Sequence, residues 1–286
     1  MQIRTFGVIG AGQMGAGIAQ TAAVSGLHVI LQDISEDFVG RGAALIRKNL
    51  ARNCEKGRLS HDDFVAAAAR IITTTDISAM KDADFVVEAA SEVEKIKYEI
   101  FSQLDKHCPA HTILASNTSS IPIGRIAANT RRPEKIIGMH FMNPVPVMKL
   151  VEVIRALPTS EETFRTTLEL SRIMGKTPAE AHDYPGFIAN RILLPMINEA
   201  VFCLYQGVGS RESIDTVMKL GMNHPMGPLA LADLIGLDTC LAILNTLHQG
   251  LGDQKYRPCP LLRQYVESGW LGRKSGRGFY DYSRDR

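Results

Sequence analysis

The chain has 286 residues, enough for one large or two ordinary domains with a sizeable core. Hydrophobic residues make up 45% of it and charged residues 22%, an ordinary globular composition that excludes a disordered or fibrous chain. The formal net charge of +2 creates no field over the whole molecule that would favour nucleic acid or a membrane surface, so we expect neither as a partner. Affinity for an anionic ligand must therefore come from a local group of cations.

The cysteines indicate a reducing compartment. The five residues Cys54, Cys108, Cys203, Cys240 and Cys259 are odd in number and widely spaced. None has the spacing of a metal site, so we expect neither a disulfide framework nor a bound metal. A glycine motif follows within ten residues of the start and no apolar stretch is long enough to span a bilayer, so we expect neither a targeting segment nor a membrane span. We expect a cytoplasmic protein or a processed mature form.

The first part of the chain alternates short β-branched runs with helical stretches. This pattern predicts an α/β fold with a doubly wound, mainly parallel sheet covered on both faces. Helical periodicity is clear in Glu92–Lys106, between two of the runs. The domain is predicted to cover residues 1–183. Its expected strands are Phe6–Ile9, His28–Gln32, Ile71–Thr75, Phe85–Glu88, Ile113–Ala115, Ile136–His140 and Leu150–Ile154.

The rest of the chain, residues 184–286, has no strand pattern and predicts a smaller all-helical domain. Phe187–Gln206 has the periodicity of a long helix, in which Pro195 predicts a kink. Ser210 is typical of a helix N-cap, and a further helix is predicted over Leu229–Leu247.

A glycine motif near the start indicates a Rossmann-type dinucleotide site. The run Gly10-Ala11-Gly12-Gln13-Met14-Gly15 has the GxGxxG form, which is weak evidence alone. Here it follows a predicted strand and opens the helical stretch Met14–Val24, the context that the motif requires. Gly10 would make the tight turn, Gly12 would let the backbone approach the pyrophosphate, and Gly15 would allow close helix packing. The first helical turn, with Gln13 and Met14, would offer N–H groups to the phosphates.

The residue after the second strand sets the expected cofactor. Asp33 can accept hydrogen bonds from both hydroxyls of the adenosine ribose and would repel a 2′-phosphate, and Ile34 follows it where an arginine would favour NADP. We therefore expect NAD(H) rather than NADP(H). The alternative is a glycine turn that binds no ligand.

Longer strings carry a family resemblance over essentially the whole chain. They are Ser116–Ser120, Gly138–Glu152, Pro185–Arg191, Lys219–Pro228 and Leu271–Tyr280. With them the sequence resembles the 3-hydroxyacyl-CoA dehydrogenase family, and most closely its bacterial 3-hydroxybutyryl-CoA branch. The resemblance implies an NAD-dependent oxidoreductase that interconverts (S)-3-hydroxyacyl-CoA and 3-oxoacyl-CoA in fatty-acid or butanoate metabolism. The coenzyme A thioester is then a substrate and not a cofactor.

The resemblance makes His140 the general base and Glu152 its orienting carboxylate. The chemistry agrees, because a neutral imidazole can take the hydroxyl proton during oxidation and return it during reduction. The two residues flank an apparent turn between two predicted strands, so contact between them is plausible. The alternative is a histidine that is simply packed at a strand end.

Two more residues match positions of the family that lie near the substrate's oxygen on the reacting carbon. Ser119 and Asn190 would donate hydrogen bonds to the substrate's oxygen and stabilise the charge that develops there. Alternatively, Ser119 is a turn or cap residue, and Asn190 satisfies backbone groups at a domain junction.

Further residues match positions of the family that lie on the nicotinamide side of the cofactor. Glu92, Lys97 and Asn143 are implied to contact the ribose or carboxamide, with Asn117 and Ser119 also at the cofactor. A solvated helix face is the alternative for Glu92 and Lys97. Lys274, in the last matching string, is implied to approach the cofactor as well.

Cations on the helix after Asp33 suit the phosphates of coenzyme A. Lys48, Arg52 and Lys56 recur every four residues, with Asn49 beside them. The resemblance implies that Asn49, Arg52 and Lys56 bind the substrate near its adenosine 3′-phosphate. A solvated basic face is the alternative.

The family's helical domain forms a homodimer, which the resemblance implies here too. Candidate contacts are Leu229, Leu231, Leu234, Ile235 and Leu237, unless they are core residues. Two other functions stay open at this stage: a dehydrogenase of free sugar acids, and an NAD-binding protein without catalysis. Acyl chain length and physiological direction also stay open.

Overall fold

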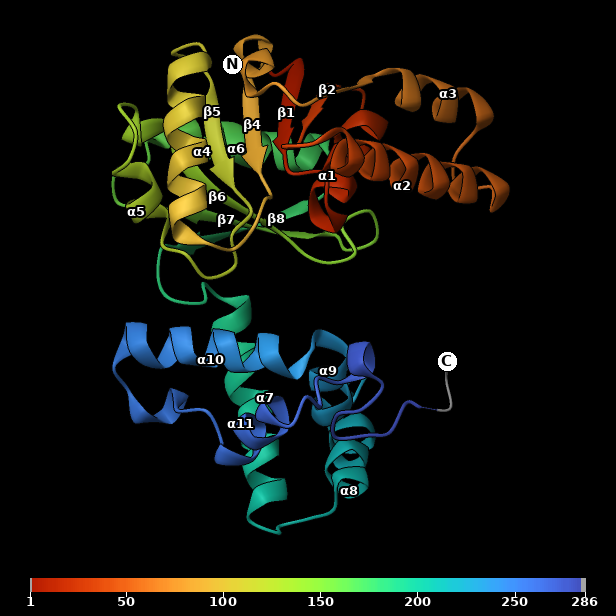
Figure 1. The fold of residues 1–286 in the computed structure, drawn as a ribbon, viewed down its shortest axis with the longest axis vertical. Helices are drawn as coiled ribbons and strands as arrows, with labels where there is room; N and C mark the ends of the chain where they lie inside the picture. The colour runs from red at the N-terminus through yellow and green to blue at the C-terminus, as the bar shows by residue number, and fades with distance from the viewer. Residues whose placement is uncertain (1, 284–286) are drawn as a thin grey trace. The chain divides into compact units, whose positions relative to one another are not determined.

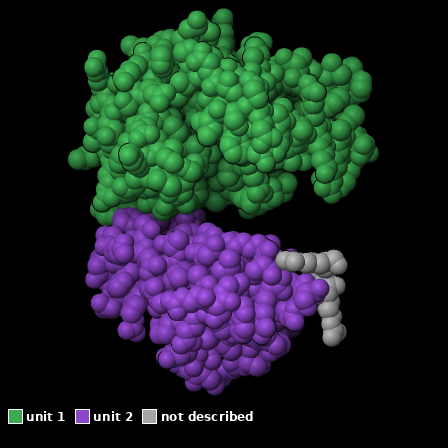
Figure 2. Space-filling model, viewed as in Figure 1, with its two compact units in different colours: residues 1–184 green, residues 185–286 purple. Residues whose placement is uncertain are grey.

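The computed structural model describes residues 2–283 and divides the chain into two compact units. The boundary lies between Tyr184 and Pro185, one residue after the position expected from the sequence (Figure 2). Each unit has its own hydrophobic core.

An eight-stranded sheet forms the centre of the first unit, in the order β3-β2-β1-β4-β5-β6-β7-β8 (Figure 1). The first six strands are parallel, β7 is antiparallel to β6, and β8 is parallel to β7. All seven predicted strands are present within one residue at either end. The strands are β1 (Thr5–Ile9), β2 (His28–Gln32), β3 (Ile71–Thr74), β4 (Phe85–Glu88), β5 (Ile113–Ser116), β6 (Ile136–Phe141), β7 (Leu150–Arg155) and β8 (Thr177–His182).

The eighth strand escaped the sequence analysis. β8 contains proline, alanine and glutamate, which have low strand propensity. It lies at the edge of the sheet, where a proline is tolerated because one side of the strand needs no partner.

Helices connect the strands, and serine side chains cap the start of three of them. Ser35, Ser60 and Ser160 each accept a hydrogen bond from a backbone N–H in the first turn, which satisfies a donor that would otherwise lack a partner. The helices are α1 (Gln13–Val24), α2 (Glu36–Glu55), α3 (His61–Ala69), α4 (Glu94–His107), α5 (Ile123–Ala127) and α6 (Glu161–Ile173), with short 3₁₀ helices η1 (Ile77–Asp82) and η2 (Pro133–Lys135).

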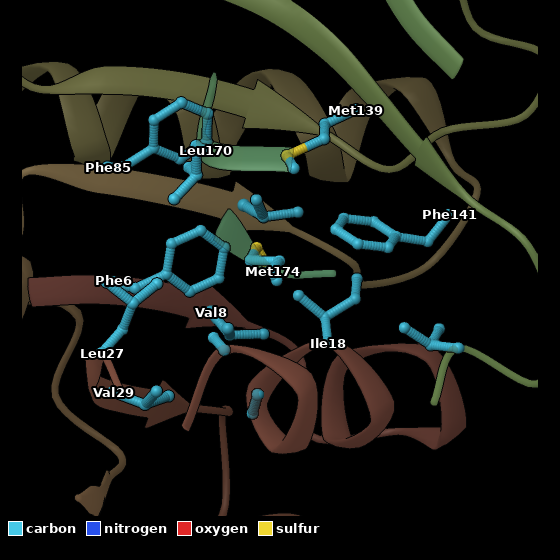
Figure 3. Packing of buried hydrophobic residues seen from close by; sticks show 14 of the residues in the cluster. Phe6, Val8, Ile18, Leu27, Val29, Phe85, Met139, Phe141, Leu170 and Met174 are labelled. Atoms are coloured by element: carbon cyan, nitrogen blue, oxygen red, sulfur yellow. The ribbon is translucent and has the colours of Figure 1, made fainter. Parts of the chain in front are cut away.

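Both faces of the sheet are covered. On one face, Phe6 of β1 and Phe85 of β4 stack with ring centres 5.7 Å apart, and Ile18 of α1 and Leu170 of α6 join the same cluster (Figure 3). Burial of such side chains stabilises the fold by roughly 1.5–3 kcal/mol each. On the other face, β1 approaches Met80 of η1. The packing therefore fixes the strand ends on which the site is built.

The second unit is helical, but one predicted helix is two. Residues expected as one stretch, Leu229–Leu247, form α9 and α10 with a bend of 98° between them. Gly236 makes the break with φ of +104°, a conformation that glycine adopts at little cost. The elements are α7 (Ala189–Tyr205), α8 (Arg211–Thr216), a π-helix η3 (Val217–Gly221), α9 (Pro228–Ile235), α10 (Leu237–Leu251), η4 (Gln254–Tyr256), α11 (Pro260–Glu267) and η5 (Arg273–Ser275).

Most of the leucines suggested as dimer contacts belong to the core of this unit. Leu229 and Leu237 are fully buried, and Leu231 and Ile235 pack against the same cluster. Leu234 is half exposed. The core interpretation is therefore correct for Leu229 and Leu237.

Within residues 2–283, no single helix has the length and apolar character needed to cross a membrane. Only the bent pair α9 and α10 meets that test, when both are taken together. Both helices contribute several buried residues to the core of their unit.

Candidate active site

The carboxyl ends of β1, β2 and β4 open onto one cavity of about 870 Å³. β1 pairs with β2 on one side and β4 on the other, so the chain changes direction across the sheet at this point. Open α/β sheets bind ligands at such a switch point. Gly10, Gly12, Gln13, Met14 and Asp33 all line the cavity.

The three motif glycines have different surroundings. Gly10 has φ of +97°, and a Cβ there would lie 2.7 Å from the Ala89 carbonyl oxygen. A Cβ at Gly15 would lie 1.7 Å from the Gly10 oxygen, so the helix could not pack against its own loop. At Gly12, by contrast, a Cβ would meet no atom within 4 Å. The open space beside Gly12 suits close approach of a pyrophosphate to the backbone.

Asp33 is tied to the glycine loop. Its Oδ2 accepts a hydrogen bond from the Ala11 N–H at 2.6 Å, and Oδ1 accepts from the Ile34 N–H at 2.7 Å. Each carboxylate oxygen can accept a further bond, so these contacts orient the group without exhausting it. The remaining acceptor positions of Asp33 therefore fit a dinucleotide whose ribose hydroxyls donate to this carboxylate.

His140 and Glu152 stand directly opposite each other on the antiparallel strands β6 and β7. Side chains of opposed residues leave the sheet on the same face, and His140 Nδ1 lies 2.8 Å from Glu152 Oε2. Both side chains are buried. Because an ionised carboxylate only accepts, Nδ1 is the donor in this contact.

Asn117 connects the end of β5 to the strand that carries the histidine. Its Oδ1 accepts a hydrogen bond from the backbone N–H of Phe141, the residue after His140. Asn143, two residues further on, accepts from Gln13 Nε2 at 3.0 Å. These two amides link the histidine strand to the loop after β5 and to the first turn of α1.

A buried charge network lies beside this loop. Lys97 Nζ is 2.7 Å and 2.8 Å from the two carboxylate oxygens of Glu88, which also accepts from Ser116 Oγ and Ala90 N–H. Lys97 is only 1% exposed, so a solvated helix face is the wrong interpretation for it. Glu88 was not among the predicted site residues, although a charged residue that ends an apolar strand pattern indicates such a role.

Glu92 joins the network to Ser119. Glu92 Oε2 is 3.4 Å from Lys97 Nζ, and Oε1 accepts from the Ser119 N–H at 2.9 Å and from Thr118 Oγ at 2.6 Å. Burial acts to raise the pKa of Glu92, but the charge of Lys97 and the hydrogen bonds from Thr118 and its neighbours lower that pKa below its usual value. Glu92 is therefore held ionised before helix α4, which begins at Glu94.

A second cavity, of about 590 Å³, gathers the predicted substrate cations. It is lined by Asn49 and Arg52 of α2, by Lys56 at the C-cap of that helix, and by Arg58. Lys48, the third member of the basic repeat, is not among the lining residues. The remaining wall is Gln20, Asn53, Pro144, Pro146 and Val147. Three cations around one cavity suit a ligand with several phosphate charges.

The loop between β6 and β7 forms walls of this cavity, and a buried lysine holds it. Lys176 Nζ donates hydrogen bonds to the carbonyl oxygens of Val145 and Met148. Desolvation lowers the pKa of Lys176. This role could not be predicted, because Lys176 lies outside every motif.

Two predicted residues belong to the second unit. Asn190 lies in the first turn of α7. Lys274, in η5, forms an ion pair with Asp238 of α10 at 2.5 Å. That pair gives Lys274 a partner within its own unit. Among the residues that the structure describes, no group of three or more His, Cys, Asp or Glu is placed to hold a metal ion.

Comparison with known proteins shows the family. Residues 5–184 match the model of the 3-hydroxyacyl-CoA dehydrogenase NAD-binding domain, and residues 186–282 match the C-terminal domain of the same family. A probable 3-hydroxybutyryl-CoA dehydrogenase of Bacillus subtilis is 59% identical over 282 residues, 99% of this chain and 98% of that protein. The human mitochondrial hydroxyacyl-coenzyme A dehydrogenase is 44% identical, over 96% of this chain and 90% of that protein.

A solved structure supports the same family assignment. The crystal structure of (S)-3-hydroxybutyryl-CoA dehydrogenase from Ralstonia eutropha superposes with a TM-score of 0.97 at 50% identity, covering 98% of this chain and 99% of that one. The matches extend over both units of the chain. The chain belongs to the 3-hydroxyacyl-CoA dehydrogenase family, and its first unit is the family's NAD-binding domain.

Proposed function

We propose that this protein interconverts (S)-3-hydroxyacyl-CoA and 3-oxoacyl-CoA with NAD(H), and that acetoacetyl-CoA and 3-hydroxybutyryl-CoA are its preferred pair. The observation that carries the proposal is the buried contact of 2.8 Å between His140 and Glu152. Relatives at 54–59% identity that are named 3-hydroxybutyryl-CoA dehydrogenase support the short acyl chain.

Proton transfer is the task of the histidine. His140 Nε2 takes the proton of the substrate's 3-hydroxyl during oxidation and returns it to the ketone oxygen during reduction. Glu152 keeps the other nitrogen protonated and stabilises the imidazolium that forms. NAD held at the cavity lined by Gly12 and Asp33 would supply the acceptor for the hydride that leaves C3 of the substrate.

Other residues position the reactants. Ser119 and Asn190 donate hydrogen bonds to the substrate's oxygen, where negative charge develops during reduction. Glu92 and Asn143 hold the nicotinamide side of the cofactor, and Lys97 acts by holding Glu92 in place. The contacts of Glu92 with the Ser119 N–H and with Lys97 support these separate roles, in which Lys97 positions Glu92 and Glu92 meets the cofactor.

The second cavity supplies binding energy away from the reacting carbon. Arg52 and Lys56, with Asn49, bind the phosphates of the nucleotide part of coenzyme A. This energy can be used to orient the thioester. A free hydroxy acid has one carboxylate and no phosphates, so three cations around one cavity favour the coenzyme A thioester.

The protein also forms a homodimer through its second unit. Val217, Leu220 and Met222 lie on or next to η3 with exposed side chains, Leu220 at 81%. Together with the half-exposed Leu234 they offer apolar surface of the kind found at interfaces. We expect light scattering to give the mass of two chains, and Leu220→Glu to give one. A monomeric wild type would contradict this part of the proposal.

The experiment that tests the function follows NADH absorbance with purified protein and acetoacetyl-CoA. Rapid loss of NADH is expected, with slow or no loss when NADPH replaces NADH or free acetoacetate replaces the thioester. Such a result would agree with a role in fatty-acid or butanoate metabolism. Binding of NADH without turnover of the thioester would contradict the proposal.

A further inference from the structure

Lys176 is a buried cation whose hydrogen-bond partners lie in one irregular loop. The residue stands between α6 and β8 and is 8% exposed. Its ammonium donates hydrogen bonds to the carbonyl oxygens of Val145 and Met148, the latter at 2.8 Å. Burying an ammonium costs free energy unless polar groups replace its water. Here the two carbonyl dipoles do so, and the charge in turn ties two points of the loop together.

The loop consists of residues 142–149 and joins β6 to β7. Within it, the Pro144 carbonyl accepts hydrogen bonds from the N–H groups of Val147 and Met148, which makes a turn. The carbonyls of Val145 and Met148 are bonded to Lys176 instead. An ammonium can donate three hydrogen bonds at once, so one side chain can fix both carbonyls.

Helix α1 also contacts the loop. A Cβ at Gly17 would lie 2.9 Å from the Val145 Cβ and 3.4 Å from the Pro146 Cδ, so the helix and the loop are packed directly together. Val145 is itself 2% exposed. The loop is thus held by two contacts, one from the helix that opens the dinucleotide site and one from Lys176.

Residues of this loop serve both cavities. Asn143 accepts a hydrogen bond from Gln13, which lines the dinucleotide cavity. Pro144, Pro146 and Val147 are walls of the second cavity, which gathers the cations. A displacement of the loop would therefore change both binding sites at once. Even small misplacements of the groups that position a substrate are costly.

We infer that Lys176 is a positioning residue that sets the binding of both ligands through this loop. The inference rests on the proposed use of NAD(H) and a coenzyme A thioester. Lys176 is not among the residues that line either cavity, so it acts through Val145 and Met148 rather than by contact with a ligand. A methionine at this position has a similar length and no charge, and it leaves both carbonyls without their donor.

The first test compares two substrates that differ in the nucleotide part. Acetoacetyl-CoA and the acetoacetyl thioester of pantetheine are reduced with NADH by the wild type and by Lys176→Met, and the ratio of the two kcat/KM values is taken. This ratio does not depend on the concentration of folded enzyme, so a loss of stability alone cannot change it. We expect the ratio to fall about 3- to 10-fold in Lys176→Met, because the walls of the second cavity shift.

The second test follows the dinucleotide site. The Kd for NADH, measured by fluorescence titration, should rise about 3- to 10-fold in Lys176→Met. If Lys176 acts by placing Asn143, the two changes remove the same contact and their effects are not additive. The double variant Asn143→Ala/Lys176→Met should therefore bind NADH as Asn143→Ala does.

A second lysine provides the matched control. Lys135 is also largely buried, with 17% of its side chain exposed, but its ammonium pairs with Glu162 of α6, outside the loop. Lys135→Met should change neither the substrate ratio nor the Kd for NADH. Should Lys176→Met not fold, Lys176→Gln takes its place, because a glutamine is also uncharged and is too short to donate to both carbonyls.

Three results would overturn the inference: an unchanged substrate ratio in the Lys176 variant, equal changes in Lys135→Met, or a rise in the Kd for NADH that persists in full when Asn143 is alanine. A wild type that binds NADH but does not reduce acetoacetyl-CoA would contradict the proposed function instead. In that case the NADH titrations of the single and double variants would still test the role of Lys176.

Discussion

Lys97 and Glu88 form a two-point ion pair, in which the ammonium lies 2.7 Å and 2.8 Å from the two carboxylate oxygens, and both side chains are buried. The pair connects the end of β4 to helix α4. Lys97 also lies 3.4 Å from Glu92, which accepts hydrogen bonds from Ser119. A charge pair in the core of the first unit thus supports the loop that carries a proposed substrate donor.

Removal of one member of this pair should destabilise the protein strongly. Glu88→Gln leaves the Lys97 ammonium buried without its main counter-charge, a change that costs about 3–5 kcal/mol. The double variant Glu88→Gln/Lys97→Met carries no buried charge and should be more stable than Glu88→Gln alone. Urea unfolding measures both. Additive losses in the double variant would show that the two residues do not act as a pair.

Asp33 should control the choice of cofactor. Asp33→Asn keeps an oxygen that can accept from the Ala11 N–H but removes the negative charge that repels a 2′-phosphate. The preference for NADH over NADPH should then fall roughly tenfold, measured as the ratio of kcat/KM values. A ratio equal to that of the wild type would remove Asp33 from this role.

The second cavity should serve the acyl-CoA substrate alone. Arg52→Ala and Lys56→Ala should each raise the KM for acetoacetyl-CoA about 5- to 20-fold, with little change in the KM for NADH, because each removes a charge-assisted contact with phosphate. Lys48→Ala is the matched control, since Lys48 lies on the same helix but not among the residues that line the cavity. Equal effects of Lys48→Ala and Arg52→Ala would instead indicate a general effect of surface charge.

Glu92 should make stability depend on acidic pH. In the folded protein the pKa of Glu92 lies below its usual value of 4.5. Ionised Glu92 therefore stabilises the folded protein above pH 4.5, and this stabilisation is lost as the pH falls through the lower pKa of the folded state. The wild type should therefore lose more stability on acidification below about pH 4.5 than Glu92→Gln does. Thermal unfolding at a series of pH values measures the difference, and parallel curves would contradict the assignment.

Much of the fold of the first unit was predictable because the sequence patterns that indicate it are local. Gly10, Gly12 and Gly15 sit between a strand and a helix in the sequence, and the cavity lies where that motif predicts it. The contact of His140 with Glu152 was only plausible from the sequence, since strand register decides it. A shift of one residue would have put the two side chains on opposite faces.

Other features depend on long-range packing that one sequence does not reveal. Lys97 looks like a surface residue of an amphipathic helix until Glu88, on a neighbouring strand, appears beside it. The break at Gly236 interrupts a helical pattern whose leucines continue on both sides.

The central claim is that His140 transfers the substrate's proton, and His140→Gln tests it most directly. With acetoacetyl-CoA and NADH, kcat should fall by roughly 10²–10⁴, because glutamine cannot exchange a proton in this pH range. The Kd for NADH, measured by fluorescence titration, should stay within about twofold, since His140 is not among the residues that line the dinucleotide cavity. A variant that keeps near-wild-type kcat would contradict the account.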